Sequence, residues 1–166
     1  MINLSLRSKI VLGLFVILLI QTCQTQGNSN QASESSSDAR SEVEQVIKKT
    51  NDYYKNGDMR WVDSYDDTYT VITDDGRSIT QYADSLRNQW KKMTQKYNVV
   101  VREPGEPTII ASDHQALHYN TASEMFINKA TNDTMDNTGT WIALWKKQKV
   151  NSWKIVLETY QARPTE

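Results

Sequence analysis

The sequence has few of the residues that build disulfides, metal sites or nucleotide-binding loops. Its 166 residues include one cysteine and two histidines. A lone cysteine forms no intramolecular disulfide, and one cysteine with two separate histidines is not a zinc-ligand set. No glycine-rich loop follows a predicted strand, and no Ser–His–Asp set is apparent. We therefore expect neither a metal nor a cofactor.

A charge excess of one sign is also absent. The formal net charge is −1, and residues 1–22 carry Arg7 and Lys9 but no acid, so the remaining chain has a charge of −1 − 2 = −3. Such a small, mixed balance argues against a nucleic-acid partner and against a polybasic membrane surface.

The longest apolar run is short. Eleven uninterrupted apolar residues, Ile10 to Ile20, follow the basic start of the chain. A membrane-spanning helix needs roughly 20 apolar residues. A basic region followed by a short apolar run is typical of a secretory signal. We predict a signal peptide over residues 1–22, and therefore an exported protein.

Cys23 follows the predicted signal directly. Ile20-Gln-Thr-Cys23 resembles the cleavage site of bacterial lipoproteins, although that site prefers Leu at position 20 and a small residue at position 22. The serine-rich residues 23–40, which contain no aliphatic or aromatic side chain larger than alanine after Cys23, predict a flexible polar tether. We expect a lipid on Cys23 and an envelope lipoprotein; a periplasmic or secreted form is the alternative.

Residues 41–163 have the length and the pattern of one α+β domain. A capping box at Ser41-x-x-Glu44 starts the first predicted helix, and Asn56-Gly57 ends it. Asp58 caps a short second helix, and Ser78 begins a third. Period-two patterns then predict strands. With a first strand before the third helix, these cover residues 69–73, 97–103, 108–111, 115–127, 138–147 and 153–162.

The predicted strand at residues 138–147 is apolar on both faces. Trp141, Ala143 and Trp145 face one way, and Ile142 and Leu144 face the other. A strand of this kind is covered on both sides. We expect helices on one side and a second copy of the chain on the other, which gives a homodimer through the sheet; a monomer with a partly exposed face is the alternative.

The order of the elements resembles the NTF2-like fold, and the local motifs resemble its SnoaL-like and DUF4440 branch. The matching motifs are Tyr54-Lys-Asn-Gly-Asp58, Trp61-x-x-x-Tyr65-Asp-Asp67, Asp74-Asp-Gly76, Thr140-Trp-x-x-x-Trp145-Lys and Trp153-Lys-Ile-Val156. The resemblance implies a cone in which three N-terminal helices pack on a curved antiparallel sheet, leaving a pocket beside the first helix.

The same resemblance implies which residues line that pocket. They are Thr50, Tyr54, Trp61, Tyr65, Thr73, Asp74, Trp141, Trp145 and Thr159. An aromatic wall with few polar groups suits a small, largely apolar ligand.

The catalytic groups of the family's isomerases are largely missing from their positions. Asp74 is the one carboxylate near the expected place of a base, and Asp-Asp-Gly also makes a turn without any catalytic role. Thr159 stands where many DUF4440-like sequences have histidine. Strand alternation places Glu158 opposite Trp153 and Ile155, on the surface or in a dimer contact.

These observations favour a domain that binds a small apolar ligand or a partner. The alternatives are a SnoaL-like isomerase, cyclase or dehydratase acting by proton transfer on a small carbonyl compound, and an assembly module without a ligand.

Overall fold

A computed structural model describes residues 29–102, 105–149 and 152–163, with side chains from Asp38 onward. The chain divides into two units, Met1–Ala32 and Ser33–Glu166, and the second contains the sheet. The predicted signal peptide, Cys23 and the first tether residues, 23–28, lie outside the described residues.

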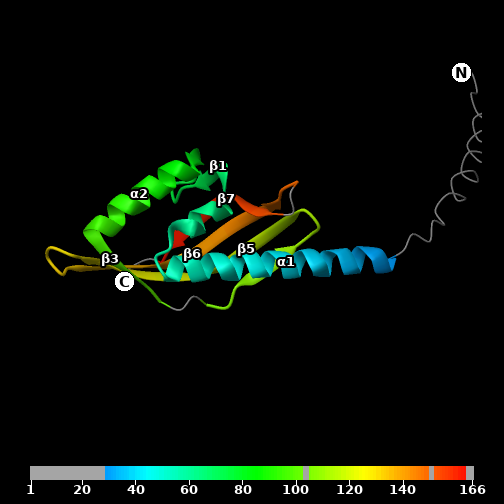
Figure 1. The fold of residues 1–166 in the computed structure, drawn as a ribbon, viewed down its shortest axis with the longest axis horizontal. Helices are drawn as coiled ribbons and strands as arrows, with labels where there is room; N and C mark the ends of the chain where they lie inside the picture. The colour runs from blue at the N-terminus through cyan, green and yellow to red at the C-terminus, as the bar shows by residue number, and fades with distance from the viewer. Residues whose placement is uncertain (1–28, 103–104, 150–151, 164–166) are drawn as a thin grey trace, which may run out of the picture. The chain divides into compact units, whose positions relative to one another are not determined.

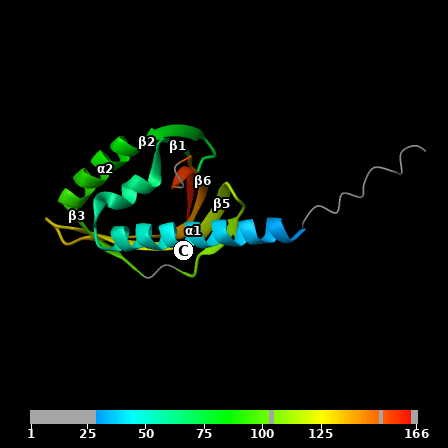
Figure 2. The same cartoon turned by 45° about the vertical axis from the view of Figure 1, so that its right-hand side comes forward.

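Seven strands form one sheet, drawn in Figures 1 and 2. Their order is β2-β1-β7-β6-β5-β3, and β4 also pairs with β5. The pairs are antiparallel except β1 with β7, which run parallel, so the prediction of a purely antiparallel sheet is corrected at this one pair. The strands are β1 Tyr65–Ile72, β2 Ser78–Tyr82, β3 Tyr97–Val101, β4 Thr108–Ala111, β5 Gln115–Asn128, β6 Thr134–Lys147 and β7 Trp153–Ala162.

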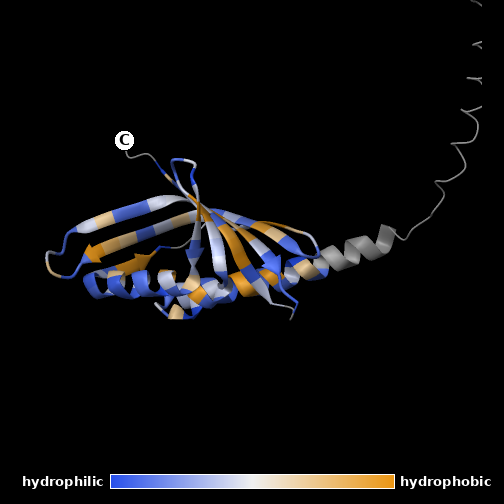
Figure 3. Ribbon diagram, turned by 90° about the horizontal axis from the view of Figure 1, so that it is seen from above, coloured by the Kyte–Doolittle hydropathy of each residue, from blue (hydrophilic) through white to orange (hydrophobic). Residues whose placement is uncertain are grey.

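The helices lie on one side of this sheet, as Figure 3 shows from above. They are α1 Ser29–Lys55, the 3-10 helix η1 Met59–Ser64, and α2 Ala83–Lys96. Ala39, Val43 and Ile47 follow each other at four-residue spacing along α1, are at most 3% exposed, and belong to the same core cluster as Trp145 and Ile155. The α+β class and the helix-covered sheet are therefore confirmed.

The first helix starts earlier than the sequence predicts. Residues 29–40, assigned to the flexible tether, form the first turns of α1, and the predicted capping box lies inside the helix. Ala39 is 3% exposed, so the packed face of the helix extends past Ser41 toward the N-terminus. Burial of that face outweighs the low helix propensity of serine and asparagine. The predicted end is correct, because Gly57 adopts φ +67° just after Lys55.

The predicted third helix is divided into a strand and a shorter helix. Residues Ser78–Tyr82 form β2, which pairs with β1 across the turn at Gly76 (φ +80°). The helix itself starts at Ala83. Ile79 and Tyr82, which lie in the segment predicted to be helical, are 36% and 57% exposed. Pairing with β1 satisfies the backbone of this segment and overrides its helical spacing.

Two strands begin four residues before their predicted starts, β1 at Tyr65 instead of residue 69 and β6 at Thr134 instead of residue 138. β6 begins early because it pairs with β5 along the whole length from Ile127↔Thr134 to Gln115↔Lys146. The connecting turn is short and contains Asn132 at φ +60°.

A β-bulge interrupts the pairing of β6 with β7. Leu144 pairs with Leu157, but the next residue, Trp145, pairs with Ile155, which leaves Val156 as an extra residue on β7. An extra residue reverses which face the following side chains point to. Ile155 faces the helices before the bulge, and Glu158 and Tyr160 face them after it.

Gly139 provides room for one of these side chains. A Cβ at this position would collide with the carbonyl oxygen of Gln161 and lie 2.7 Å from Cζ and Oη of Tyr160. Only glycine allows the Tyr160 ring to cross β6 this closely.

We therefore predict that Gly139→Ala lowers the free energy of unfolding by about 1–3 kcal/mol, the usual cost of overpacking. Chemical denaturation followed by tryptophan fluorescence measures the change. Gly105→Ala is the matched control, because its new Cβ would find its closest atoms, Thr121 Cβ and Oγ1, at 3.5 Å, an ordinary contact. Equal stability of the two variants would contradict the role given to Gly139.

Candidate functional site: an aromatic cavity with two glutamates

A cavity of about 350 Å³ lies between the sheet and the three helices. The last turns of α1 provide Thr50 and Tyr54, η1 provides Trp61, and α2 provides Trp90. The floor comes from β5, β6 and β7, where the small side chain of Ala122 leaves open space. This size lies within the range of small-molecule sites.

The helix side of the cavity is a cluster of aromatic rings. Tyr54 lies 5.2 Å from Trp61 and 5.2 Å from Trp90, and the two tryptophans are 5.4 Å apart, all measured between ring centroids. Tyr65 extends the cluster at 5.9 Å from Trp61. Trp61 packs edge-to-face against Tyr54, Tyr65 and Trp90, which makes a stable apolar wall. Asp58 positions Trp61 by accepting a hydrogen bond from Arg60 N at 3.0 Å and capping η1.

Glu158 is the innermost carboxylate of the floor. Tyr65 Oη donates to Glu158 Oε2 at 2.6 Å, and Trp141 Nε1 donates to the same oxygen at 2.8 Å. Burial raises the pKa of Glu158, and these two hydrogen bonds oppose the rise. Burial, followed by the charge of Glu158, raises the pKa of Tyr65 well above its usual value, so the phenol keeps its proton.

The position of Glu158 corrects the sequence-based assignment to the outer surface. Alternation from Trp153 and Ile155 would place it there, but the bulge at Val156 turns it inward. The same reversal turns Thr159, predicted to line the pocket, to the opposite face, where it pairs with Ile142 of β6. A bulge of one residue has no reliable sequence signature, and this explains both errors.

Glu124, on β5, forms a second carboxylate–tyrosine pair of the same kind. Tyr54 Oη donates to Glu124 Oε1 at 2.6 Å, and Asn137 Nδ2 donates to Oε2 at 3.3 Å. Burial, then the negative charge of Glu124, raises the pKa of Tyr54. Glu124 and Ala122 fall on the same alternation as His118, so the period of β5 could have indicated an inward glutamate.

Several polar atoms in the wall have no partner among the described residues. They are Trp61 Nε1, Asn120 Oδ1 and Tyr160 Oη, all buried and all on residues that line the cavity. Buried polar groups are hydrogen-bonded in the great majority of proteins. These three atoms therefore lack the hydrogen bonds that such groups usually make.

Five of the predicted pocket residues do line the cavity. They are Thr50, Tyr54, Trp61, Tyr65 and Trp141. Thr50 donates to the carbonyl of Val46 at 2.8 Å and lies 2.5 Å from Ser64 Oγ, which joins α1 to η1.

The other predicted pocket residues lie elsewhere. Trp145 is fully buried in the core, below the cavity, because its row of β6 is covered by α1. Thr73 and Asp74 lie in the turn between β1 and β2, where Asp74 is exposed and accepts a hydrogen bond from Asp75 N at 2.9 Å. Asp74, the predicted catalytic carboxylate, is therefore an exposed turn residue and does not line the cavity.

The described part of the chain contains no group of three or more acidic, histidine or cysteine side chains that could hold a metal ion. Within the same residues, no helix is long and apolar enough to cross a membrane.

Comparison with known proteins identifies the fold. No protein-family model matches the sequence, and no curated protein matches it. A protein of the nuclear transport factor 2 (NTF2-like) superfamily from Salmonella enterica serovar Typhimurium is similar in structure, with a TM-score of 0.58 and 16% identity over 75% of this chain and 94% of that one.

Two further structures agree with this result. A conserved protein from Planctomyces limnophilus gives a TM-score of 0.63 with 11% identity, over 76% of this chain and 100% of that one. A protein from Novosphingobium aromaticivorans, named as a candidate scytalone dehydratase, gives 0.65 with 9% identity, over 81% and 90%. At these identities the likeness shows the fold alone, and the chain has the NTF2-like fold.

The raised pKa of Glu158 predicts a pH-dependent effect of Glu158→Gln. Because the folded state binds this proton more tightly than the unfolded state does, ionisation of Glu158 costs stability as the pH rises from its ordinary value of 4.5 through its raised value. Glutamine has no such cost and keeps an oxygen for Tyr65 and Trp141. The stability of Glu158→Gln relative to wild type should therefore increase from pH 4 to pH 8, as measured by urea unfolding.

The matched control is Thr159→Val, the neighbouring position on the outer face, which introduces no titratable group. Its difference from wild type should not change with pH. A constant or decreasing difference for Glu158→Gln would show that Glu158 is not destabilised in its charged form.

Proposed function

We propose that this domain binds a small molecule with an apolar, ring-sized body in the cavity between its sheet and its helices. The observation that supports this is the combination of an aromatic wall with buried polar atoms that no described residue satisfies, Trp61 Nε1, Asn120 Oδ1 and Tyr160 Oη. The apolar body would contact the rings, and polar groups on the ligand would satisfy these atoms.

Energetics favour occupation of the cavity. Leaving a buried polar atom without a partner costs about 1–3 kcal/mol. Contacts with aromatic side chains contribute through burial of apolar area, about 25 cal/mol per Å². A ligand that bonds to the polar atoms and also covers the aromatic rings gains binding free energy from both, whereas water satisfies only the polar atoms.

Ala122 on the floor gives a direct test. Ala122→Phe should fill the cavity and weaken binding at least tenfold, while the fold is kept because the added ring enters existing space. A panel of small aromatic and alicyclic alcohols, ketones and amines can be screened by quenching of the fluorescence of Trp61, Trp90 and Trp141, with calorimetry on each hit.

Thr121→Phe is the matched control, since Thr121 is exposed and adjacent on the same strand. It should bind the hits as wild type does. Hits that bind Ala122→Phe and wild type equally would place the ligand outside this cavity and overturn the proposal.

A second candidate function is catalysis by proton transfer, as in the SnoaL-like branch that the sequence resembles. The observation that favours it is Glu158, a buried carboxylate with a raised pKa, held by Tyr65 and Trp141. A carboxylate with these properties is suited to remove a proton next to a carbonyl group.

This candidate predicts exchange of hydrogen for deuterium next to the carbonyl of small cyclic ketones in deuterated buffer, followed by NMR. Glu158→Gln should lose the exchange, and Asp74→Asn should keep it because Asp74 lies in the exposed turn. Exchange at the rate of buffer alone with wild type would reject the catalytic function.

We also propose that the protein is exported and held at the cell envelope through a lipid on Cys23. The signal-like residues 1–22 and the position of the lone cysteine support this. Wild type should incorporate a labelled fatty acid and sediment with membranes, and Cys23→Ala should do neither. An unlabelled, soluble wild type would favour the secreted or periplasmic form.

We also propose that the protein forms a homodimer through the outer face of the sheet. Three apolar side chains are partly exposed on this face, Ile110 at 63%, Leu117 at 37% and Tyr119 at 38%. The row of apolar residues extends across the sheet, because Ile110 pairs with Leu117, Leu117 with Leu144, and Leu144 with Leu157. Light scattering should give a dimer that Leu117→Lys dissociates, while Ile79→Lys on β2 leaves it intact.

A further inference from the structure

We infer that the ligand of this cavity is an organic cation, a protonated amine on an apolar or aromatic body, whose ammonium group lies against Glu158. This rests on the proposed function and specifies the class of its ligand. Three observations support it: the order of charges from the inside of the cavity to its mouth, the use of its hydrogen-bond donors, and its ring faces.

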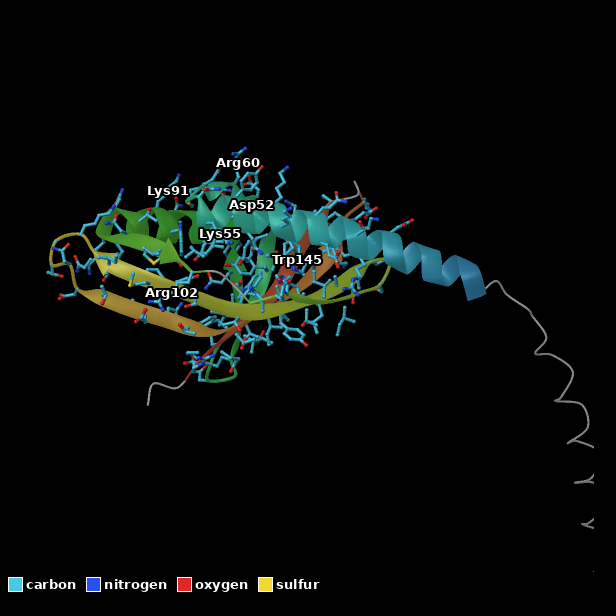
Figure 4. The ribbon with its side chains drawn as sticks, turned by 90° about the horizontal axis from the view of Figure 1, so that it is seen from below. Asp52, Lys55, Arg60, Lys91, Arg102 and Trp145 are labelled. Atoms are coloured by element: carbon cyan, nitrogen blue, oxygen red, sulfur yellow. The ribbon has the colours of Figure 1, made fainter. Side chains whose placement is uncertain are left out.

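The charges are arranged by depth. The carboxylates of Glu158 and Glu124 belong to the floor, whereas the cations of the lining, Lys55 and Arg102, are exposed at the mouth. Figure 4 shows Lys55 at the end of α1 and Arg102 beside the sheet. Arg102 Nη2 is paired with Asp136 Oδ1 at 2.6 Å. Exposed charges are screened by water and salt, and inner ones much less, so the inner negative charge decides what the cavity attracts.

Three donors of the cavity are already used, whereas Trp61 Nε1 and Tyr160 Oη have no partner among the described residues. Tyr54 Oη, Tyr65 Oη and Trp141 Nε1 each donate to one of the two glutamates. Both bonds to Glu158 reach Oε2, so no described residue donates to Oε1. Asn120 Oδ1 is a further acceptor to which no described residue donates. A group that brings several N–H donors and a positive charge therefore fits better than one that brings acceptors.

The rings add an attraction that a neutral donor lacks. Trp61, Trp90, Trp141 and Tyr65 line the same cavity as Glu158. A cation within about 6 Å of a ring centroid is attracted by the ring face, most strongly where water is excluded. Trp61, which is 7% exposed and has an unpartnered Nε1, can also donate to an acceptor on the ligand body.

A matched series of ligands separates charge from shape. Calorimetry should compare 2-phenylethylamine, 2-phenylethanol and phenylacetate, which share the ring and differ in charge. We expect the amine to bind at least tenfold more tightly than the alcohol, and phenylacetate to bind more weakly than both. The affinity for the amine should also increase from pH 5 to pH 8, because protonation of Glu158 removes the charge that it binds.

Charge removal at Glu158 should abolish this preference. Glu158→Gln should bind the amine no more than threefold tighter than the alcohol, while its affinity for the alcohol stays near that of wild type. Glu124→Gln is a second variant that should reduce the preference to a smaller extent. Asp67→Asn, which removes one exposed acid on β1, is the charge-matched control and should leave the preference unchanged.

The outcomes distinguish this inference from the proposed function. Equal binding of amine and alcohol, or tighter binding of the alcohol or of phenylacetate, overturns the inference and leaves the cavity as a site for neutral or anionic ligands. If none of the three binds, the inference also fails, and the wider panel with Ala122→Phe decides the proposed function separately. A preference that survives in Glu158→Gln and Glu124→Gln would place the cation elsewhere and overturn the inference.

Discussion

The bulge at Val156 on β7 determines the chemistry of the cavity, because it decides which side chains of the last strand point toward the helices. Without the extra residue, Glu158 would continue the outward row and Leu157 would face inward. The sheet would then close over an apolar core with no carboxylate at this position. With the extra residue Val156 present, Glu158 and Tyr160 turn inward. The close approach of Tyr160 to β6 is possible because residue 139 is glycine. One backbone irregularity and one missing side chain thus produce the polar floor.

An inward carboxylate is costly, and the remaining structure near the cavity reduces that cost. The transfer of a charge out of water is unfavourable unless donors replace the lost hydration. Tyr65 at the start of β1 and Trp141 on β6 provide these donors for Glu158, and Tyr54 on α1 does so for Glu124. Each donor comes from a different element, so the site depends on the correct packing of the helix side onto the sheet. The raised pKa of Glu158 shows that the compensation is incomplete. Perturbed pKa values of this kind cluster at functional sites.

Sequence reasoning succeeded where local chemistry dictates the structure. Asn56-Gly57 ended α1 because glycine accepts a positive φ, Asp58 capped η1, and period-two patterns gave β4 and β7 with their observed bounds. It failed where tertiary contacts override local preference. β1 drew Ser78–Tyr82 into a hairpin, and burial of Ala39 extended α1 into a serine-rich segment. The helix side of the cavity was predictable from Tyr54, Trp61 and Tyr65, whereas its inner carboxylate was not, since a bulge depends on pairing between strands.

The use of donors inside the cavity also bears on the choice between binding and catalysis. Removal of a proton next to a carbonyl requires a base and, in addition, donors that hold the oxygen where negative charge develops. Glu158 meets the first requirement. The phenols of Tyr54 and Tyr65 and the indole of Trp141 are committed to the glutamates, which leaves Trp61 Nε1 and the hydroxyl of Tyr160 among the lining groups. A cavity that uses three donors to hold two carboxylates is organised around acidic groups of its own rather than around negative charge on a ligand. This arrangement favours recognition of a donor-bearing ligand over stabilisation of an oxyanion.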